Sequence, residues 1–356
     1  MNWRWLFGLK PKELTDQPYR KYTITVVIPA YNEEKSIVNT INSIRNQSVV
    51  VDCIIVVDDC STDKTKEIAI SQGVKVVRTD KNQGTKAMAQ NYVVGMIDTN
   101  LMVTIDADTT LHKDAIKNTL PYFNDDLTAS VCGFVIPQKI RTLWERGRFI
   151  EYMFGLSVFK SAQMNAGAII VSSGCFSVFR TKHVKDMGGF QARTMAEDMD
   201  LTWEFLMHGY HIHYAPNSYC YPIDPPTYKI FKAQVERWYR SFFQNISAHQ
   251  LRKNKKLGGF IYWYLLDSII APILALILWF YTSNFAAVIF CAILIDLMIV
   301  LIVCSITGIR IKMIKETLLS IWAFFIIRPV NFCLFWKAFW KEWIVKDRLM
   351  VWEKGH

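Results

Sequence analysis

The chain has 356 residues, 51% of them apolar, and a formal net charge of +10, so it is long enough for one large catalytic domain and a smaller appendage. The positive excess suggests an anionic partner such as a nucleotide or a lipid headgroup. No zinc-finger, RNA-binding or helix-turn-helix signature is present, so we expect no nucleic-acid partner. Eight cysteines without a CxxC pair argue against a disulfide framework and favour a reducing compartment.

The first 20 residues combine aromatic and basic side chains, with Trp3 and Trp5 flanking Arg4. This pattern suits an interfacial anchor, and an arm packed on the domain surface is the alternative. The apolar stretch is far too short for a signal peptide. We therefore predict an interfacial arm at 1–20, ahead of a domain at 21–255.

The domain at 21–255 alternates predicted strands and helices. Strands are predicted where apolar, β-branched residues form a nearly unbroken run, and helices where apolar residues recur every three to four positions. The predicted elements are a strand at 23–29, a helix with Ile37, Ile41 and Ile44, a strand at 53–59, a helix capped by Ser61, Thr62 and Asp63 and ended by Gly73, a strand at 74–78, a helix at 85–97, a strand at 101–106 and a helix from His112. The alternation indicates an α/β fold with a doubly wound, mostly parallel sheet, whose ligands bind at the carboxyl ends of the strands.

Residues 138–165 form a predicted amphipathic helical segment, in which Trp144, Phe149 and Phe159 are interspersed with charges. Such a helix can lie at a membrane interface or pack into the core, and the sequence leaves both open. A second interface helix is predicted at 228–250.

Two apolar stretches, 260–281 and 285–307, are each close to the ~20 residues that a transmembrane helix requires. The short linker between them has no Lys or Arg, whereas both outer flanks are basic. The positive-inside rule then places the flanks and the catalytic domain in the cytosol. We expect a multi-pass protein of the plasma membrane, with a membrane domain at 258–356.

The third apolar stretch, 318–340, is interrupted by Arg328 and Pro329 and followed by a basic tail. We favour a re-entrant or interfacial segment over a third crossing. Asp296 lies deep in the second predicted span, where a lone charge is costly. We therefore predict that Asp296 pairs with Arg328 or faces a polar cavity.

The clearest chemical signal is the pair Asp106 and Asp108, which directly follows a predicted strand. Residues i and i+2 of an extended chain point the same way, so the two carboxylates converge. Convergent hard oxygens suit Mg²⁺ or Mn²⁺ carrying a diphosphate. Because a DxD pattern is common, a polar turn is the alternative.

Two further acidic pairs follow predicted strands or open a predicted helix. Asp58 and Asp59 could accept hydrogen bonds from a nucleobase or ribose, although a helix cap and a turn would also explain them. Glu197 and Asp198 lie near Asp200, and a buried carboxylate among other acids can act as a base. Acidic residues are also routine at helix N-termini.

The segment QVERWYR contains Gln234, Arg237 and Trp238. An arginine is suited to gripping a diphosphate leaving group, and a tryptophan offers a flat platform for a sugar ring. Alone, the segment could be a basic, aromatic helix facing a membrane.

Taken together and in this order, these motifs resemble the family 2 nucleotide-sugar glycosyltransferases. They resemble in particular the membrane branch with hyaluronan, chitin, cellulose and poly-N-acetylglucosamine synthases. The resemblance runs over 23–245, about two-thirds of the chain, and implies the GT-A fold of nucleotide-diphosphosugar transferases. It assigns the donor nucleotide to Pro29, Tyr31, Glu33, Asp58, Asp59, Lys86 and Asp106, the metal to Asp106 and Asp108, catalysis to Glu197 and Asp198, and the diphosphate and acceptor side to Gln234, Arg237, Trp238, Gly174 and Cys175.

The mechanism that the resemblance implies is a single in-line displacement with inversion. Asp198 would take the proton of the acceptor hydroxyl, while Mg²⁺ or Mn²⁺ at Asp108 and the guanidinium of Arg237 neutralise the departing diphosphate. A Cys175 thiolate is a rival nucleophile, but a double displacement needs a second supporting base. His208, His211 and His213 could ligate a metal, but we favour surface or core packing for them.

The chain departs from most processive synthases in lacking predicted transmembrane helices before the catalytic domain. Two or three membrane segments can hardly enclose a polymer channel, so we expect a homo-oligomer or a partner membrane subunit. The preferred reaction is transfer from a UDP-sugar, UDP-GlcNAc or UDP-Glc, to a growing glycan. The alternative is single-sugar transfer to a lipid such as a polyprenyl phosphate or ceramide, and a non-enzymatic membrane scaffold is a third hypothesis.

Overall fold

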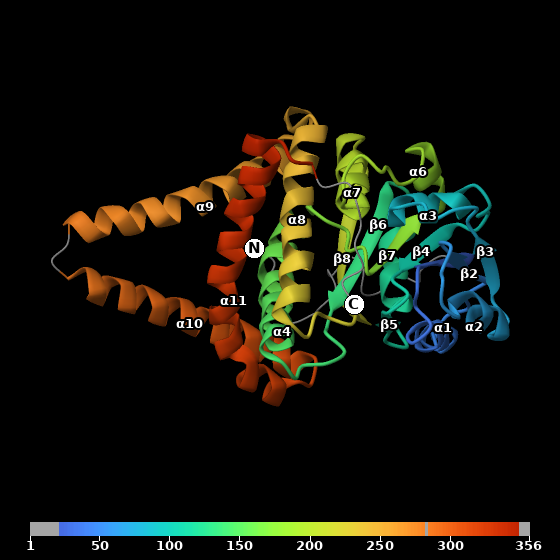
Figure 1. Ribbon diagram of the computed structural model, residues 1–356, viewed down its shortest axis with the longest axis horizontal. Helices are drawn as coiled ribbons and strands as arrows, with labels where there is room; N and C mark the ends of the chain where they lie inside the picture. Colours follow the sequence, from blue (N-terminus) through green and yellow to red (C-terminus); the bar gives the residue numbers. More distant parts are fainter. Residues whose placement is uncertain (1–20, 282–283, 349–356) are drawn as a thin grey trace.

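The computed structural model describes residues 21–281 and 284–348. The arm predicted at 1–20 lies outside the described residues. An α/β domain, a layer of long helices and a projecting pair of helices lie side by side, as Figure 1 shows.

An eight-stranded sheet forms the centre of the α/β domain, in the order β3-β2-β1-β4-β7-β6-β8-β5. Its strands are β1 (Ile24–Ala30), β2 (Cys53–Asp58), β3 (Lys75–Arg78), β4 (Leu101–Ile105), β5 (Thr110–Leu111), β6 (Thr128–Val135), β7 (Phe176–Arg180) and β8 (His211–Tyr221). The first four neighbours are parallel, β7 runs antiparallel between β4 and β6, and β5 runs antiparallel to β8. The predicted parallel arrangement is therefore found in the first half, and the whole sheet is mixed.

Short helices cover the sheet. They are α1 (Ile37–Arg45), α2 (Thr65–Ser71), α3 (Lys86–Val94), the 3-10 helix η2 (Lys117–Asn124), α6 (Thr181–Asp186) and α7 (Glu197–Met207). Successive side chains of β1 point to opposite faces, so Val26 joins Ile41 of α1 in one core cluster and Val27 joins Val93 of α3 in the other. A strand buried on both faces is nearly continuous in apolar residues, which is why β1 could be recognised in the sequence.

One local prediction is wrong. The chain after His112 forms no α-helix but the 3-10 helix η2, which contains Pro121, and proline removes an amide donor from a helix interior. Of the residues predicted to cap α2, Asp63 accepts a hydrogen bond from the backbone N–H of Thr65, the first residue of the helix, at 3.0 Å. Asp63 also accepts the N–H of Glu34 at 3.1 Å, which ties its loop to the end of β1.

A layer of long helices stands beside β8. It consists of α4 (Leu143–Phe154), the π-helix η3 (Gly155–Lys160), α5 (Ser161–Ala166), α8 (Tyr228–Ala248), and α11 (Ile314–Phe339) with the π-helix η5 (Trp340–Val345). Thr142 and Glu145 form a capping box that starts α4. A Cβ atom at Gly147 would lie 2.6 Å from Ile327, so glycine lets α4 approach α11 closely.

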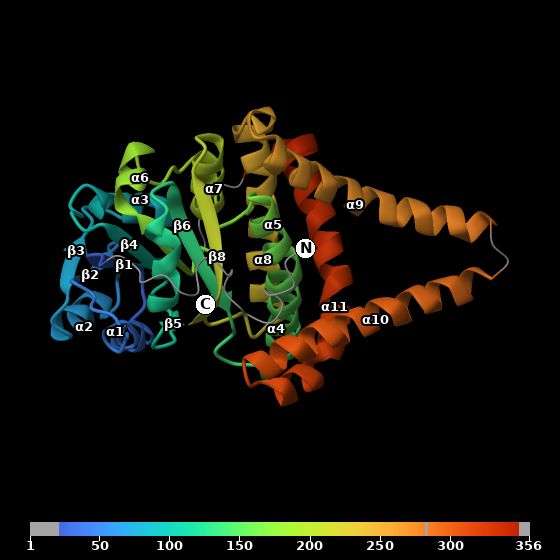
Figure 2. The same cartoon turned by 180° about the vertical axis from the view of Figure 1, so that it is seen from behind.

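Helices α9 (Lys255–Tyr281) and α10 (Phe285–Arg310) project away from the rest of the chain, whereas α11 lies along α4 and α8 (Figures 1 and 2). Two stretches of the described chain, α10 and α11 continued through η5, are long and apolar enough to span a bilayer. Only 11% of the apolar window in α10 is buried, against 44% in α11.

Helix α11 is continuous over Ile314–Phe339, through Arg328 and Pro329. The re-entrant or interfacial placement of this stretch stays a prediction. Arg328 of α11 forms an ion pair with Asp296 of α10, as predicted.

Candidate active site

A cluster of charged side chains gathers where β4 ends, β7 begins and α7 starts. Lys86 of α3 lies at its centre, with its Nζ atom 2.5 Å from Asp106 Oδ1 and 3.5 Å from Glu197 Oε1. The same ammonium donates a hydrogen bond to the carbonyl oxygen of Gly174, at 2.8 Å. Lys86 thus connects α3 to three other segments of the chain.

Asp198, in the first turn of α7, is held by backbone donors. The Gly174 N–H donates to Asp198 Oδ2 at 2.7 Å, and the Met199 N–H donates to Oδ1 at 2.8 Å. A Cβ atom at position 174 would lie 2.8 Å from Asp198 Oδ2 and 3.3 Å from Lys86 Nζ. Glycine is therefore needed for the backbone to approach the carboxylate, whose orientation is fixed.

The acids of this cluster outnumber its cations. Burial raises the pKa of Asp106, Lys86 opposes this rise, and the nearby Asp108 and Asp198 add to it. Burial likewise raises the pKa of Glu197 above its usual range, against the effect of Lys86. The Lys86 ammonium faces three carboxylates, those of Asp106, Glu197 and Asp198, and Asp108 adds a fourth acid beside Asp106; such an excess of hard oxygens fits a divalent cation.

Asp108 is partly exposed, and its backbone carbonyl accepts a hydrogen bond from Gln138 at 3.0 Å. The chain turns here, with the Thr109 N–H donating to the Asp106 carbonyl at 3.0 Å, so the extended geometry assumed for residues i and i+2 is not present; Asp108 nevertheless adds to the raised pKa of Asp106. Asp106 and Asp108 are the residues that could hold Mg²⁺ or Mn²⁺ here.

The other predicted acidic pair, at the end of β2, uses the chain's own donors. Asp58 is fully buried, with Oδ2 2.6 Å from Arg78 Nη1. Asp59 accepts hydrogen bonds from the Thr79 hydroxyl at 2.9 Å and from the Gln83 N–H at 2.9 Å. These bonds hold the loop that leads into α3 and Lys86.

The remaining donor-side predictions lie at the end of β1. Pro29 pairs with Val57 within the sheet, and Tyr31 follows the strand. The carboxylate of Glu33 accepts a hydrogen bond from the Ser36 hydroxyl at 2.5 Å. These residues share the carboxyl edge of the parallel strands with Asp58 and Asp106.

The QxxRW residues lie on α8. Gln234 accepts a hydrogen bond from Arg148 at 3.2 Å, and the Trp238 ring lies 4.6 Å from the guanidinium carbon of Arg148. The Arg237 side chain makes no ion pair or hydrogen bond within the described part of the chain. No contact joins Arg237 directly to Asp198, but its guanidinium remains available to a ligand.

Three residues near the site were missed in the sequence, namely Arg148, Tyr152 and Asp224. Tyr152 donates to Asp224 Oδ1 at 3.2 Å. Burial raises the pKa of Asp224 to about 7, Arg148 opposes this, and Asp108 contributes to the rise. The only signals in the sequence were an arginine within the predicted helix at 138–165 and an acid among the prolines after β8.

Cys175 does not carry the properties of a nucleophile. Its Sγ atom lies 3.9 Å from Cys220 Sγ, and this contact together with burial raises the pKa of the Cys175 thiol well above its usual range. Because the thiolate is the nucleophilic form, the geometry disfavours the rival double displacement.

The predicted histidines lie elsewhere. His211 Nδ1 is 2.7 Å from Asp125 Oδ2, and the His213 ring packs against Tyr122 at 5.4 Å between centroids. Ligand atoms of Asp125, His211 and His213 lie within 4.8 Å of one another and could hold a metal. This group stands where β8 begins, at the opposite end of the sheet from Asp106.

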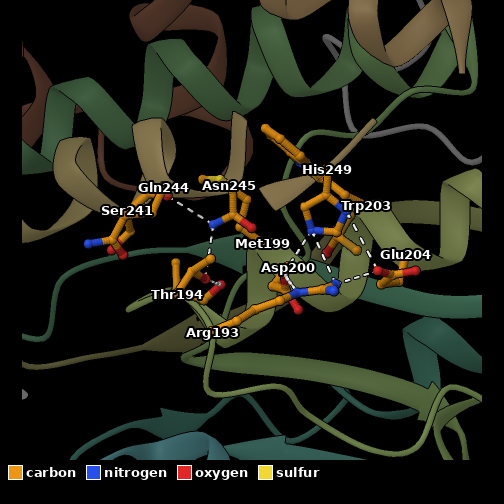
Figure 3. A network of polar contacts seen from close by, with 12 residues as sticks. Arg193, Thr194, Met199, Asp200, Trp203, Glu204, Ser241, Gln244, Asn245 and His249 are labelled. Atoms are coloured by element: carbon orange, nitrogen blue, oxygen red, sulfur yellow. Dashed lines mark hydrogen bonds and ion pairs between the residues drawn. The ribbon is translucent and has the colours of Figure 1, made fainter. Parts of the chain in front are cut away.

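A polar network fastens α7 to the end of α8 (Figure 3). Arg193 Nε donates to Asp200 Oδ1 at 2.7 Å, and His249 Nε2 lies 2.7 Å from the same oxygen. Arg193 also pairs with Glu204. Both Asp200 and His249 are buried, so the helix that carries Asp198 is rigidly held against the helix of the QxxRW residues.

The comparison with known proteins agrees with this arrangement. Residues 25–188 match the family described as "Glycosyl transferase family 2". The chain is 28% identical over 220 residues to a poly-beta-1,6-N-acetyl-D-glucosamine synthase of Staphylococcus aureus (strain COL), covering 60% of this chain and 53% of that protein. It is 27% identical over 251 residues to the synthase of the same name from Staphylococcus epidermidis, covering 67% and 59%. The chain thus spans little more than half the length of these curated relatives.

Among solved structures, the mannosyltransferase PcManGT from Pyrobaculum calidifontis, in complex with GDP-Man and Mn²⁺, superposes with a TM-score of 0.62. The identity is 18%, over 89% of this chain and 92% of that chain, so this likeness concerns the fold. The mixed sheet with its covering helices is the GT-A arrangement that the sequence motifs implied. Residues 25–188 therefore match a glycosyl transferase family 2 domain.

Proposed function

We propose that this protein is an inverting, metal-dependent glycosyltransferase that moves a sugar from a UDP-sugar to a growing glycan at a membrane. The observation that carries the proposal is the cluster of Lys86, Asp106, Glu197 and Asp198, which are joined directly or through Gly174 although they span more than a hundred positions of the chain. The poly-N-acetylglucosamine synthases among the relatives support UDP-GlcNAc as the first donor to test.

In the proposed reaction, Asp198 takes the proton of an acceptor hydroxyl as that oxygen attacks the anomeric carbon. The bond between the anomeric carbon and the phosphate oxygen breaks on the opposite side, so UDP leaves and the configuration inverts. Two backbone N–H groups orient Asp198 for this step. Glu197 sits beside it and binds Lys86, which fixes the position of the ammonium.

The donor side combines acids with cations. Asp106 and Asp108 would hold a divalent ion, which when bound neutralises the charge that develops on the diphosphate. The guanidinium of Arg237 is suited to a phosphate oxygen. Tyr31 and Glu33, at the end of β1, remain the proposed nucleoside contacts, while Asp58 and Asp59 hold the loop beside them.

The membrane proposal rests on α9 and α10. Trp263 and Phe280 of α9 and Phe290 and Met298 of α10 are each more than half exposed, and an apolar surface of this extent indicates a lipid environment. In both views the two helices point away from the sheet while α11 lies along α4 and α8 (Figures 1 and 2). We therefore infer that α9 and α10 enter the bilayer and that α11 lies at its interface.

The flanks of this helical pair carry the positive charge. Arg252, Lys253, Lys255 and Lys256 precede or open α9, and Arg310, Lys312 and Lys315 end or follow α10. The positive-inside rule then supports a cytosolic catalytic domain.

The test uses purified full-length protein in lipid vesicles with Mn²⁺ and radiolabelled UDP-GlcNAc or UDP-Glc. We expect release of UDP from one of the two donors, and a loss of about a thousandfold in the Asp198→Asn variant, which lacks the general base. Asp98→Asn is the matched control, because the Asp98 side chain is 97% exposed and lies outside the cluster. Absence of turnover with every donor would favour a membrane scaffold.

Product size distinguishes the two acceptor classes. A ladder of water-soluble oligosaccharides supports glycan synthesis by this chain, alone, as an oligomer or with a partner subunit. A single product that partitions into organic solvent supports transfer to a lipid, the candidate favoured by a membrane part of only two projecting helices.

A further inference from the structure

Arg148 of α4 is a buried cation whose contacts lead to the QxxRW motif. Its side chain is 2% exposed, and Nη1 pairs with Glu151 Oε2 at 2.6 Å. Nη2 donates to Gln234 Oε1 at 3.2 Å. Burying a charge costs free energy unless the charge is paired and hydrogen-bonded. The buried guanidinium of Arg148 therefore indicates a specific role for this residue.

Two aromatic rings of α8 complete the surroundings of Arg148. The guanidinium carbon lies 4.6 Å from the ring centroid of Trp238 and 4.9 Å from that of Phe231. A guanidinium stacks favourably on aromatic faces. Gln234 and Trp238 are four positions apart and therefore share one face of the helix, so a single arginine holds the first and the last residue of the motif.

Asp224, in the loop after β8, extends this group of contacts. Its Oδ1 atom lies 3.8 Å from Arg148 Nε and accepts the hydrogen bond of Tyr152. Its other oxygen is buried without a hydrogen-bond partner in the described part of the chain, as is Arg148 Nε. Through Tyr152 and Asp224, the contacts of Arg148 thus join α4 to the loop that follows β8.

We propose that Arg148 is a positioning residue for the acceptor, because it clamps Trp238 and Gln234 in the orientation that receives the acceptor sugar. The inference rests on the proposed function. Trp238 is partly exposed while Arg148 stacks on its ring, which leaves surface for a sugar. None of the contacts among Lys86, Asp106 and Asp198 involves Arg148, so its loss should affect the acceptor more than the donor.

The test measures two rates in the same preparation. The first is donor hydrolysis, followed as UDP release without an acceptor, and the second is sugar transfer to a short β-1,6-linked N-acetylglucosamine oligosaccharide. In Arg148→Met we expect the ratio of transfer to hydrolysis to fall about tenfold, with a higher KM for the oligosaccharide, as one charge-assisted hydrogen bond and one stacking contact are lost. Arg148→Lys keeps the charge but not the planar stacking group, so it should recover only part of the ratio.

Arg146→Met is the matched control. Arg146 lies on the same helix, but it donates to Ser320 and to the backbone of Leu319 in α11 and touches neither QxxRW residue. We expect its ratio of transfer to hydrolysis to equal that of the wild type. In Trp238→Phe, the further change Arg148→Met should cost less than it does in the wild type, because Arg148 acts through Trp238.

The outcomes separate this inference from the proposed function. A wild type that releases no UDP defeats the proposed function. If the wild type releases UDP but does not transfer sugar to the oligosaccharide, the proposed role of Trp238 and Arg148 in acceptor binding is contradicted. If hydrolysis and transfer fall in equal proportion in a folded Arg148→Met or Arg148→Lys variant, Arg148 is only a structural residue.

Discussion

Asp58 ends β2 and Asp106 follows β4, two strands that both pair with β1, yet their carboxylates have opposite surroundings. Asp58 is fully buried and satisfied by Arg78 and by the backbone N–H of Ser61. Asp106 shares one ammonium, that of Lys86, with two other acids, Glu197 and Asp198. A carboxylate at a strand end is therefore a candidate ligand only where the neighbouring cations do not neutralise its charge. A carboxylate with a full set of partners, such as that of Asp58, mainly holds its own loop.

The largest expected effect is that of Asp108→Asn on the release of UDP. We expect a loss of UDP release of at least about a hundredfold, because one anionic metal ligand is removed from the side on which charge develops. The Mn²⁺ concentration for half-maximal activity should rise as well. The measurement is a metal titration of the rate, with Asp98→Asn as the exposed control; an unchanged Mn²⁺ dependence would place the metal elsewhere.

The contribution of Asp224 to the free energy of unfolding depends on pH. Its pKa is raised from 3.8 to about 7 by burial, so the folded state keeps a proton that the unfolded state loses near pH 4. The free energy of unfolding therefore falls as the pH rises from about 4 to 7. The Asp224→Asn variant has no ionisable group here and should be more stable than the wild type at pH 8. We expect a net gain on the order of 2 kcal/mol in the free energy of unfolding, because the weaker contact with Arg148 offsets part of the gain.

The measurement is the thermal unfolding midpoint of both proteins between pH 5 and pH 8. The gain of Asp224→Asn should shrink toward pH 5. A gap that does not change with pH would mean that the pKa of Asp224 is the same in the folded and unfolded states.

The smallest expected effect is that of Asp58→Asn on stability. The substitution keeps the shape but removes the charge that pairs with Arg78, whose side chain is 38% exposed. Water compensates the exposed guanidinium in part, so we expect a loss of about 1 kcal/mol. A urea midpoint equal to that of the wild type would show that the Asp58–Arg78 pair contributes nothing measurable.

Strands with both faces buried, such as β1, β2 and β4, were predictable because their apolar runs are unbroken. The antiparallel strand β7 was not, since its pairing with β4 and β6 depends on segments far away in the sequence. Spacing did not reveal that the chain turns after β4, at Asp106 and Asp108.

The partners of these acids could not be read from the sequence. Arg78 lies twenty positions after Asp58, and Arg148 lies 86 positions before Gln234, and nothing local marks either pair. Helix α11 continues through Pro329, a residue that usually ends a helix, and it packs along α4 and α8.

The most direct test of the central claim is a calorimetric titration of UDP into the wild type, Asp108→Asn and Asp198→Asn, with and without Mn²⁺. If one cluster combines a metal site with a base, UDP binding to the wild type and to Asp198→Asn depends on Mn²⁺, and Asp108→Asn loses this dependence. Binding of UDP that is equally strong with and without Mn²⁺ in the wild type would contradict the account.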